Sequence, residues 1–203
     1  MKKYIEKGLS IEEYLKMIDD LLEEGKTTGE NQTESLFNYA KLNRQRIKRL
    51  DKTANLNETL AEKAWSFNRK MIWLIITEGW CSDAAQNMPV VEKIAAENEN
   101  INTLYILRDE NLELMDQYLT NNTRSIPILI ALDANSLEKL GTWGPRPKAA
   151  ADYRAELITE GLEKSEISEK IQRWYLNNKE QDIQNEFEIL LSDWEITTES
   201  VSV

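Results

Sequence analysis

The sequence predicts an α/β fold with a central sheet and flanking helices, and three observations support this prediction. Residues 71–76 (MIWLII) are continuously apolar, and a short turn leads from them into a segment with apolar side chains at helical spacing. The same strand–helix pattern recurs at 102–107 and about 110–120, so the two strands should be parallel and joined by a right-handed crossover. A third strand at 128–132 and a returning strand at 137–143 predict a hairpin.

Three helices are predicted before the first strand. Ser10 and Glu13 have the spacing of a capping box, and Gly25 can end the amphipathic helix that follows. Residues 31–34 can cap a second helix, and residues 57–67 predict a third. The C-terminal half of the second helix is basic, and we interpret it as a solvated face, with a patch for an acidic partner as the alternative. Its basic residues are Lys41, Arg44, Arg46, Lys48, Arg49 and Lys52.

Helical patterns also follow the hairpin. Pro147 suits the first position of a helix that Gly161 should end. Ser165 is predicted to cap a second helix, and the apolar spacing over 183–194 predicts a last one. Residues 197–203 should fray.

Composition excludes several kinds of chemistry. The chain of 203 residues has a net charge of −11, one cysteine and no histidine. The lack of histidine excludes Ser-His and Cys-His catalysis, and a single cysteine argues against a zinc or iron–sulfur site. We therefore expect no metal and no cofactor. The acidic balance disfavours binding to nucleic acid or to an anionic membrane.

Cysteine usage and the apolar runs indicate a compartment. The N-terminus lacks the apolar stretch of a signal peptide, and no run approaches the ~20 residues that span a bilayer. One cysteine cannot form an internal disulfide, which agrees with a reducing environment. A cytoplasmic protein is therefore expected.

The lone cysteine, Cys81, falls between the first predicted strand and its helix. The unpaired N–H groups and the dipole at a helix N-terminus favour a thiolate there. Glu78 and Asp83 oppose it, because each would place a second negative charge nearby. Asp83 could instead cap the helix, so the sign of the shift in the thiol pKa stays open.

These residues carry a resemblance to a known family. The motif WCSDA at 80–84 resembles the thioredoxin active site, in which a tryptophan precedes C-x-x-C. Pro89 stands where thioredoxins keep a helix-kinking proline, and RSIPIL at 124–129 resembles the segment with their cis-proline. The resemblance covers about 64–142, and the whole chain is similar to a bacterial branch of thioredoxin-like proteins with helical extensions at both ends.

The resemblance implies a thioredoxin-like fold and a candidate site. It predicts an exposed Cys81 as the catalytic residue, beside a cis peptide bond that leaves the backbone of the preceding residue free to pair with an extended substrate. Trp143 and Arg146 are either a second wall of this site or a tryptophan packed on prolines. The substrate-binding residues implied are Trp80, Ser82, Asp83, Ile126 and Pro127.

Two departures from the family pattern decide the predicted chemistry. Ala84 replaces the second cysteine, and Ile75 replaces the buried aspartate that accepts a proton in thioredoxins. A mixed disulfide at Cys81 must therefore wait for an external thiol. The predicted function is monothiol thiol–disulfide exchange with a protein or a low-molecular-weight thiol or disulfide. The alternative is a non-enzymatic module that binds a protein near Cys81 and Pro127.

Three regions are expected to form one globular unit. They are a helical N-terminal extension at 1–56, a thioredoxin-like core at 57–150 and a helical C-terminal extension at 151–203. The oligomeric state is not set by the sequence.

Overall fold

A computed structural model describes residues 1–196 of the chain. The expectation that residues 197–203 fray concerns a segment outside the described residues.

The centre of the molecule is a four-stranded mixed sheet with the order β2-β1-β3-β4. Strand β1 (Met71–Thr77) pairs in parallel with β2 (Ile101–Leu107) and antiparallel with β3 (Ile128–Asp133). Strand β4 (Lys139–Trp143) completes the hairpin with β3. This arrangement confirms the predicted α/β class, with the parallel pair and the terminal hairpin as expected.

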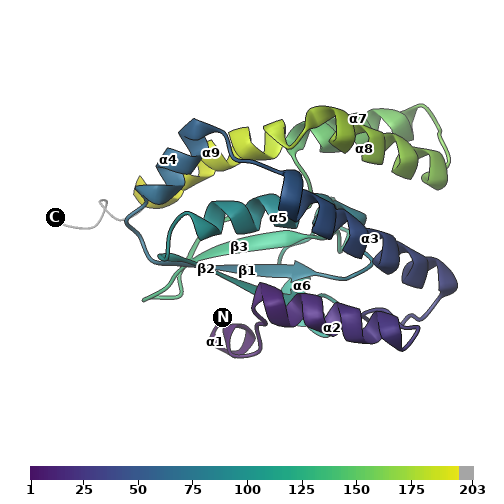
Figure 1. Ribbon diagram of the computed structural model, residues 1–203, viewed down its shortest axis with the longest axis horizontal. Coiled ribbons are helices and arrows are strands. Elements are labelled where there is room, and N and C mark those ends of the chain that lie inside the picture. Colours follow the sequence, from purple (N-terminus) through teal and green to yellow (C-terminus); the bar gives the residue numbers. More distant parts are fainter. Residues whose placement is uncertain (197–203) are drawn as a thin grey trace.

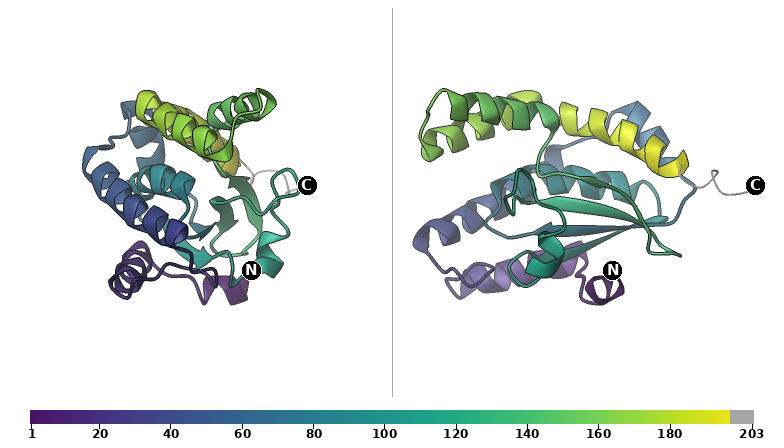
Figure 2. Two further views of the ribbon diagram at one scale, coloured as in Figure 1. Left: turned by 90° about the vertical axis from the view of Figure 1, so that its right-hand side faces the viewer. Right: turned by 180° about the vertical axis from the view of Figure 1, so that it is seen from behind.

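Helices cover both sides of this sheet (Figures 1 and 2). Helix α5 (Ser82–Ala96) lies on one side, with α3 (Glu34–Thr53) packed along it. The short helix α1 (Lys2–Ile5) lies on the other side, and α2 (Ile11–Glu23) lies along the β2 edge, where it packs on α3 and its Tyr14 ring stacks on Tyr105. A bridge between Leu9 and Tyr105 attaches the segment between α1 and α2 to β2.

The caps at the N-terminal helices follow the expected chemistry. Ser10 and Glu13 form the reciprocal capping box of α2, and Gly25 follows that helix with a φ of 73°. Thr33 accepts a hydrogen bond from Leu36 at the start of α3, and Asn57 caps α4 (Glu58–Trp65).

The helix predicted at about 110–120 is much shorter than expected. Helix α6 is a single turn, Leu112–Met115. Thr120 and Thr123 then pair across a tight turn in which Asn121 and Asn122 have positive φ angles. Asparagine tolerates this left-handed conformation, and the turn redirects the chain toward β3.

The C-terminal extension consists of α7 (Lys148–Thr159), α8 (Lys164–Asn178) and α9 (Gln181–Ile196). Gly161 follows α7 with a φ of 78°, as expected for a residue that ends a helix. The predicted cap at Ser165 is wrong, because α8 already begins at Lys164 and Ser165 lies inside it. Glu163 is its N-cap, and Glu166 accepts a hydrogen bond from the Glu163 N–H.

The two parts of this extension pack differently. Helix α9 inserts Phe187, Leu191 and Trp194 into the central core, where Phe187 and Trp194 contact Trp73 of β1. A Cβ atom on Gly141 of β4 would collide with the Trp194 indole, so only glycine fits there. Helices α7 and α8 instead form a small cluster of their own, made of Leu157, Ile167, Ile171 and Tyr175.

Candidate functional site

Cys81 stands at the point where the chain leaves β1 and enters α5. It is the N-cap of α5, and its Sγ accepts a hydrogen bond from the Ala84 N–H at 3.4 Å. The thiol also donates to the Ile126 carbonyl at 3.2 Å. The sulfur therefore joins the start of α5 to the segment that precedes β3.

The turn before Cys81 is fixed by residues of the N-terminal region. The Gly79 N–H donates to the Thr28 hydroxyl at 2.9 Å, and the Asn43 side chain of α3 donates to the Gly79 carbonyl at 3.1 Å. A Cβ atom on Gly79 would meet Ile18 of α2 at 3.3 Å. Helices α2 and α3 thus pack directly on the cysteine loop.

The prediction that Cys81 is exposed is wrong. The residue is 7% exposed, because α5, the Ile126 segment and the N-terminal helices surround it. Burial, with a further contribution from the charge of Asp83, raises the pKa of the Cys81 thiol to about 12. The hydrogen bond from the Ala84 N–H acts in the opposite direction but is the smaller effect.

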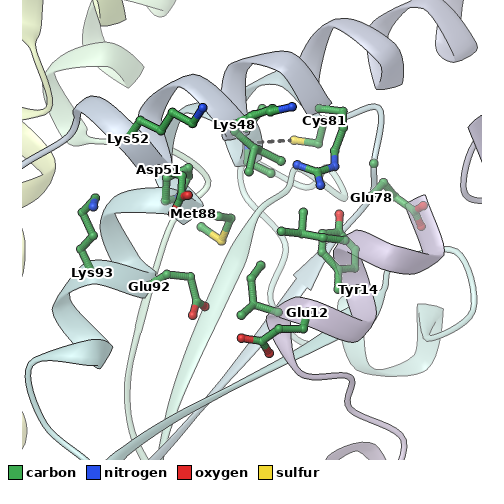
Figure 3. A pocket seen from close by; sticks show the side chains of 18 of the residues that line it. Glu12, Tyr14, Lys48, Asp51, Lys52, Glu78, Cys81, Met88, Glu92 and Lys93 are labelled. Atoms are coloured by element: carbon green, nitrogen blue, oxygen red, sulfur yellow. Dashed lines mark hydrogen bonds between the residues drawn. The ribbon is translucent and has the colours of Figure 1, made fainter. Parts of the chain in front are cut away.

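The two carboxylates near Cys81 behave differently: Asp83 opposes a thiolate as expected, and Glu78 is not among the groups that shift the thiol pKa. Asp83 does not cap α5; its side chain pairs with Arg146 and accepts a 2.8 Å hydrogen bond from the Tyr175 hydroxyl. Glu78 is buried and turns away from the thiol to accept the Asp109 N–H at 2.9 Å (Figure 3). Its burial raises the pKa of the Glu78 carboxyl.

The Ile126–Pro127 peptide bond is cis, and the carbonyl that precedes it faces Cys81. Pro127 itself is buried. Gly144 packs against its backbone so closely that a Cβ atom there would collide with the Pro127 carbonyl. Within residues 1–196 the Ile126 N–H forms no hydrogen bond.

An opening of about 430 Å³, which we name the Ile126 opening, lies beside these groups. It brings together five of the six candidate residues from the sequence; Pro127 is not among its lining residues. Arg108 stacks on Trp80 with its guanidinium carbon 4.7 Å from the ring centroid. The lining consists of Trp80, Cys81, Ser82, Asp83, Arg108, Thr123, Arg124, Ser125, Ile126 and Arg146.

The two residues of the 143–147 loop have separate roles. Trp143 belongs to the core, where it packs on Phe187 at 5.5 Å and donates to Glu186 at 2.6 Å. Arg146 faces the site through its pair with Asp83. The sequence contained no signal for this pair, because 63 positions separate the two residues.

A second, larger space borders Cys81 from the other side. This cavity of about 600 Å³ lies between α2, α3 and α5, and we name it the α2–α3–α5 cavity (Figure 3). Cys81 is the one residue that lines both spaces. The cavity was not predicted from the sequence.

No three cysteine or carboxylate side chains of residues 1–196 are placed to hold a metal ion together. No helix of that part is long and apolar enough to cross a bilayer.

The mixed sheet and the strand–loop–helix unit with a capping cysteine define a thioredoxin-like α/β protein. A family model described as Thioredoxin matches residues 29–160, well over half of the chain, and the chain belongs to this family. None of the curated proteins matches it.

Two solved structures share the fold. A 1.5 Å crystal structure of a protein of unknown function from Pseudomonas aeruginosa has a TM-score of 0.54 and 16% identity, over 91% of this chain and 98% of that one. A crystal structure of an HIV epitope scaffold has a TM-score of 0.53 and 18% identity, over 86% and 96%. At these identities the likeness shows the fold alone.

Proposed function

We propose that this thioredoxin-like protein is a binding module that holds an extended segment of a partner protein at the Ile126 opening. The observation that carries the proposal is the state of Cys81, which is buried and hydrogen-bonded as a protonated thiol. Such a group supports the architecture of the site without acting as its nucleophile.

The chemistry of exchange explains why turnover is disfavoured. The thiolate is the nucleophile, and a pKa of about 12 leaves only on the order of one molecule in 10⁵ ionised at neutral pH. The chain also has no second cysteine to resolve a mixed disulfide.

The binding surface uses backbone groups. The Ile126 N–H is unpaired within the described residues, and its carbonyl keeps one lone pair beyond the bond from Cys81. An extended peptide can pair with both, as in other modes of strand addition. Trp80, held by Arg108, offers an aromatic face beside that position.

Monothiol exchange at Cys81 is the second candidate, and the position of the sulfur between two openings favours it. In this reaction the Cys81 thiolate attacks a disulfide, forms a mixed disulfide and releases the other half as a thiolate. An external thiol then attacks the mixed disulfide and restores Cys81. This path needs a conformation in which the thiol is less buried.

Two measurements separate the candidates. The first is the rate of mixed disulfide formation at pH 7 with a small aromatic disulfide, followed by mass spectrometry. The second is selection of displayed peptides against the wild-type chain, followed by binding assays with Cys81→Ser and Ser125→Trp. The module predicts negligible mixed disulfide and peptide binding that survives Cys81→Ser but not Ser125→Trp. Rapid mixed disulfide formation, with no peptide that discriminates Ser125→Trp, would favour exchange instead.

A further inference from the structure

The α2–α3–α5 cavity is a feature that the proposed function does not use. Its volume of about 600 Å³ lies within the usual range of small-molecule sites, roughly 300–1,000 Å³. It shares only Cys81 with the Ile126 opening. Helices α2 and α3 form two of its walls, so the N-terminal extension creates it.

Part of the cavity wall is apolar, and charged side chains line the rest. Met88 points into it from α5 in Figure 3, and a thioether side chain adapts to ligands of different shape. Ile11 and Leu15 of α2 and Ile47 of α3 extend this apolar part of the wall. The apolar lining residues are Ile11, Tyr14, Leu15, Ile47, Ala84, Ala85, Met88, Pro89 and Ala96.

Three lysines line the same cavity. Lys48 and Lys52 are one turn apart on α3, and Lys93 is on α5. Within residues 1–196 none of the three has a carboxylate within the 4.0 Å that defines an ion pair, although the chain has a net charge of −11. Arg44, the other basic lining residue, is already paired with Asp19.

Acidic groups on the opposite side set the orientation of a ligand. Figure 3 shows the carboxylates of Glu12 and Glu92 on the side away from Lys48 and Lys52. Glu92 accepts a 2.5 Å hydrogen bond from Tyr105 and is partly buried. A negative head group is therefore repelled at that side and attracted at the lysines. Asp51 is the one acidic lining residue between Lys48 and Lys52 in the chain.

We propose that the α2–α3–α5 cavity binds an amphipathic carboxylate with an aliphatic body. The head group meets Lys48, Lys52 and Lys93, and the chain covers the apolar wall around Met88. This site goes beyond the binding of a peptide at the Ile126 opening, because the two spaces are lined by different residues.

The test uses three probes with the same ten-carbon chain and different head groups: decanoate, decanol and decyltrimethylammonium. Calorimetric titration of the full chain should show binding of decanoate and weaker binding of the other two. The double substitution Lys48→Gln and Lys52→Gln should weaken decanoate binding roughly fivefold to tenfold, about 1–1.4 kcal/mol in total, because it removes two charges that attract the head group. Asp51→Asn should strengthen it, because the opposing charge is gone.

Lys16→Gln is the matched control. Lys16 lies on α2, is exposed and pairs with Asp20 outside the cavity, so its loss should leave decanoate binding unchanged. The proposal is overturned if the three probes bind equally, if Lys16→Gln weakens decanoate as much as the α3 pair, or if Asp51→Asn weakens it. Melting temperatures of all variants check that the exposed substitutions leave the fold intact.

Discussion

The Tyr175 hydroxyl of α8 donates a 2.8 Å hydrogen bond to Asp83, two residues after the lone cysteine. Asn87 of α5 donates to the same hydroxyl at 3.0 Å, and Arg146 pairs with the other Asp83 oxygen. The C-terminal extension is thus tied to the start of α5. The charge that opposes a thiolate at Cys81 is held in place by residues from outside the strand–loop–helix unit.

Asp83→Asn should lower the pKa of the Cys81 thiol. The Asp83 charge raises this pKa and that of Arg146 lowers it, so the substitution removes the first effect and keeps the second. Burial is unchanged, so the pKa should stay above the ordinary value. The rate of alkylation by iodoacetamide as a function of pH measures the shift.

The same substitution should destabilise the protein. The side chains of Arg146 and Asp83 are only 15% and 14% exposed. Removing one partner of such a buried ion pair leaves the other charge unpaired, so the free energy of unfolding should fall by roughly 2–3 kcal/mol. Asp116→Asn is the control, because it breaks the exposed pair with Arg124 and should change stability by less than about 1 kcal/mol. Urea unfolding measures both variants. If Asp83→Asn and Asp116→Asn lowered the free energy of unfolding equally, the buried pair would stabilise the fold no more than the exposed one.

Alkaline pH should destabilise the wild-type chain more than Cys81→Ser. The folded pKa of the thiol, about 12, lies above the unfolded value of ~8.5, so the contribution of the protonated thiol is complete below about pH 8.5. It is lost as the pH rises toward 12, by about 1.4 kcal/mol per unit. The free energy of unfolding of both proteins is measured at pH 7 and at pH 10. Both contain the same tyrosines, so the contribution of tyrosine titration cancels when the two pH dependences are subtracted. Parallel curves would contradict a buried thiol.

Phe187→Ala should cost about 3–5 kcal/mol, because it leaves a cavity in the central core. Phe187 is fully buried and its ring lies 5.5 Å from both Trp73 and Trp143. Ile189 lies on the same helix but is 64% exposed, so Ile189→Ala should change stability by less than about 0.5 kcal/mol. Truncation after Gly161 removes both α8 and α9 and should cause aggregation or a clear loss of thermal stability. A truncated chain that stayed soluble, monomeric and equally stable would show that the removed extension is a separate unit.

The fold was predictable where local patterns determine it. The continuous apolar run of β1 and the spacing of Ser10 and Glu13 each depend on neighbouring residues, and both predictions are confirmed. Helix α6 was overestimated because apolar spacing continues through residues 112–119, while the turn at Asn121 depends on backbone conformation.

The residues of the candidate site could be predicted from the sequence, but their burial could not. The family motif identified Cys81 and Ile126, which the structure joins by a hydrogen bond. The burial of Cys81 depends on contacts from distant parts of the chain, such as the bond from Asn43 to Gly79, 36 positions apart. No local pattern encodes such contacts, so the raised thiol pKa could not be predicted.

Ala84→Cys should restore a dithiol pair at C-x-x-C spacing. Ala84 lies one helical turn from Cys81, and its N–H faces the Cys81 sulfur at 3.4 Å. Cysteine is little larger than alanine, so the helix should tolerate it although the position is only 5% exposed. Mild oxidation should then form an intramolecular disulfide, counted as the loss of two free thiols per chain.

Disulfide reductase activity should appear with the new pair, but slowly. Ile75 offers no buried carboxylate to accept a proton, and Asp83 still opposes the Cys81 thiolate. Reduction of insulin disulfides by the variant, compared with the parent and with Ala85→Cys, measures the gain. Ala85 lines the α2–α3–α5 cavity, as Ala84 does, but it lacks the C-x-x-C spacing from Cys81. The thiol introduced by Ala85→Cys therefore controls for the mere presence of a second cysteine. A parent chain that reduced insulin as fast as Ala84→Cys would show that Cys81 already acts as a nucleophile, and the binding module would have to be abandoned.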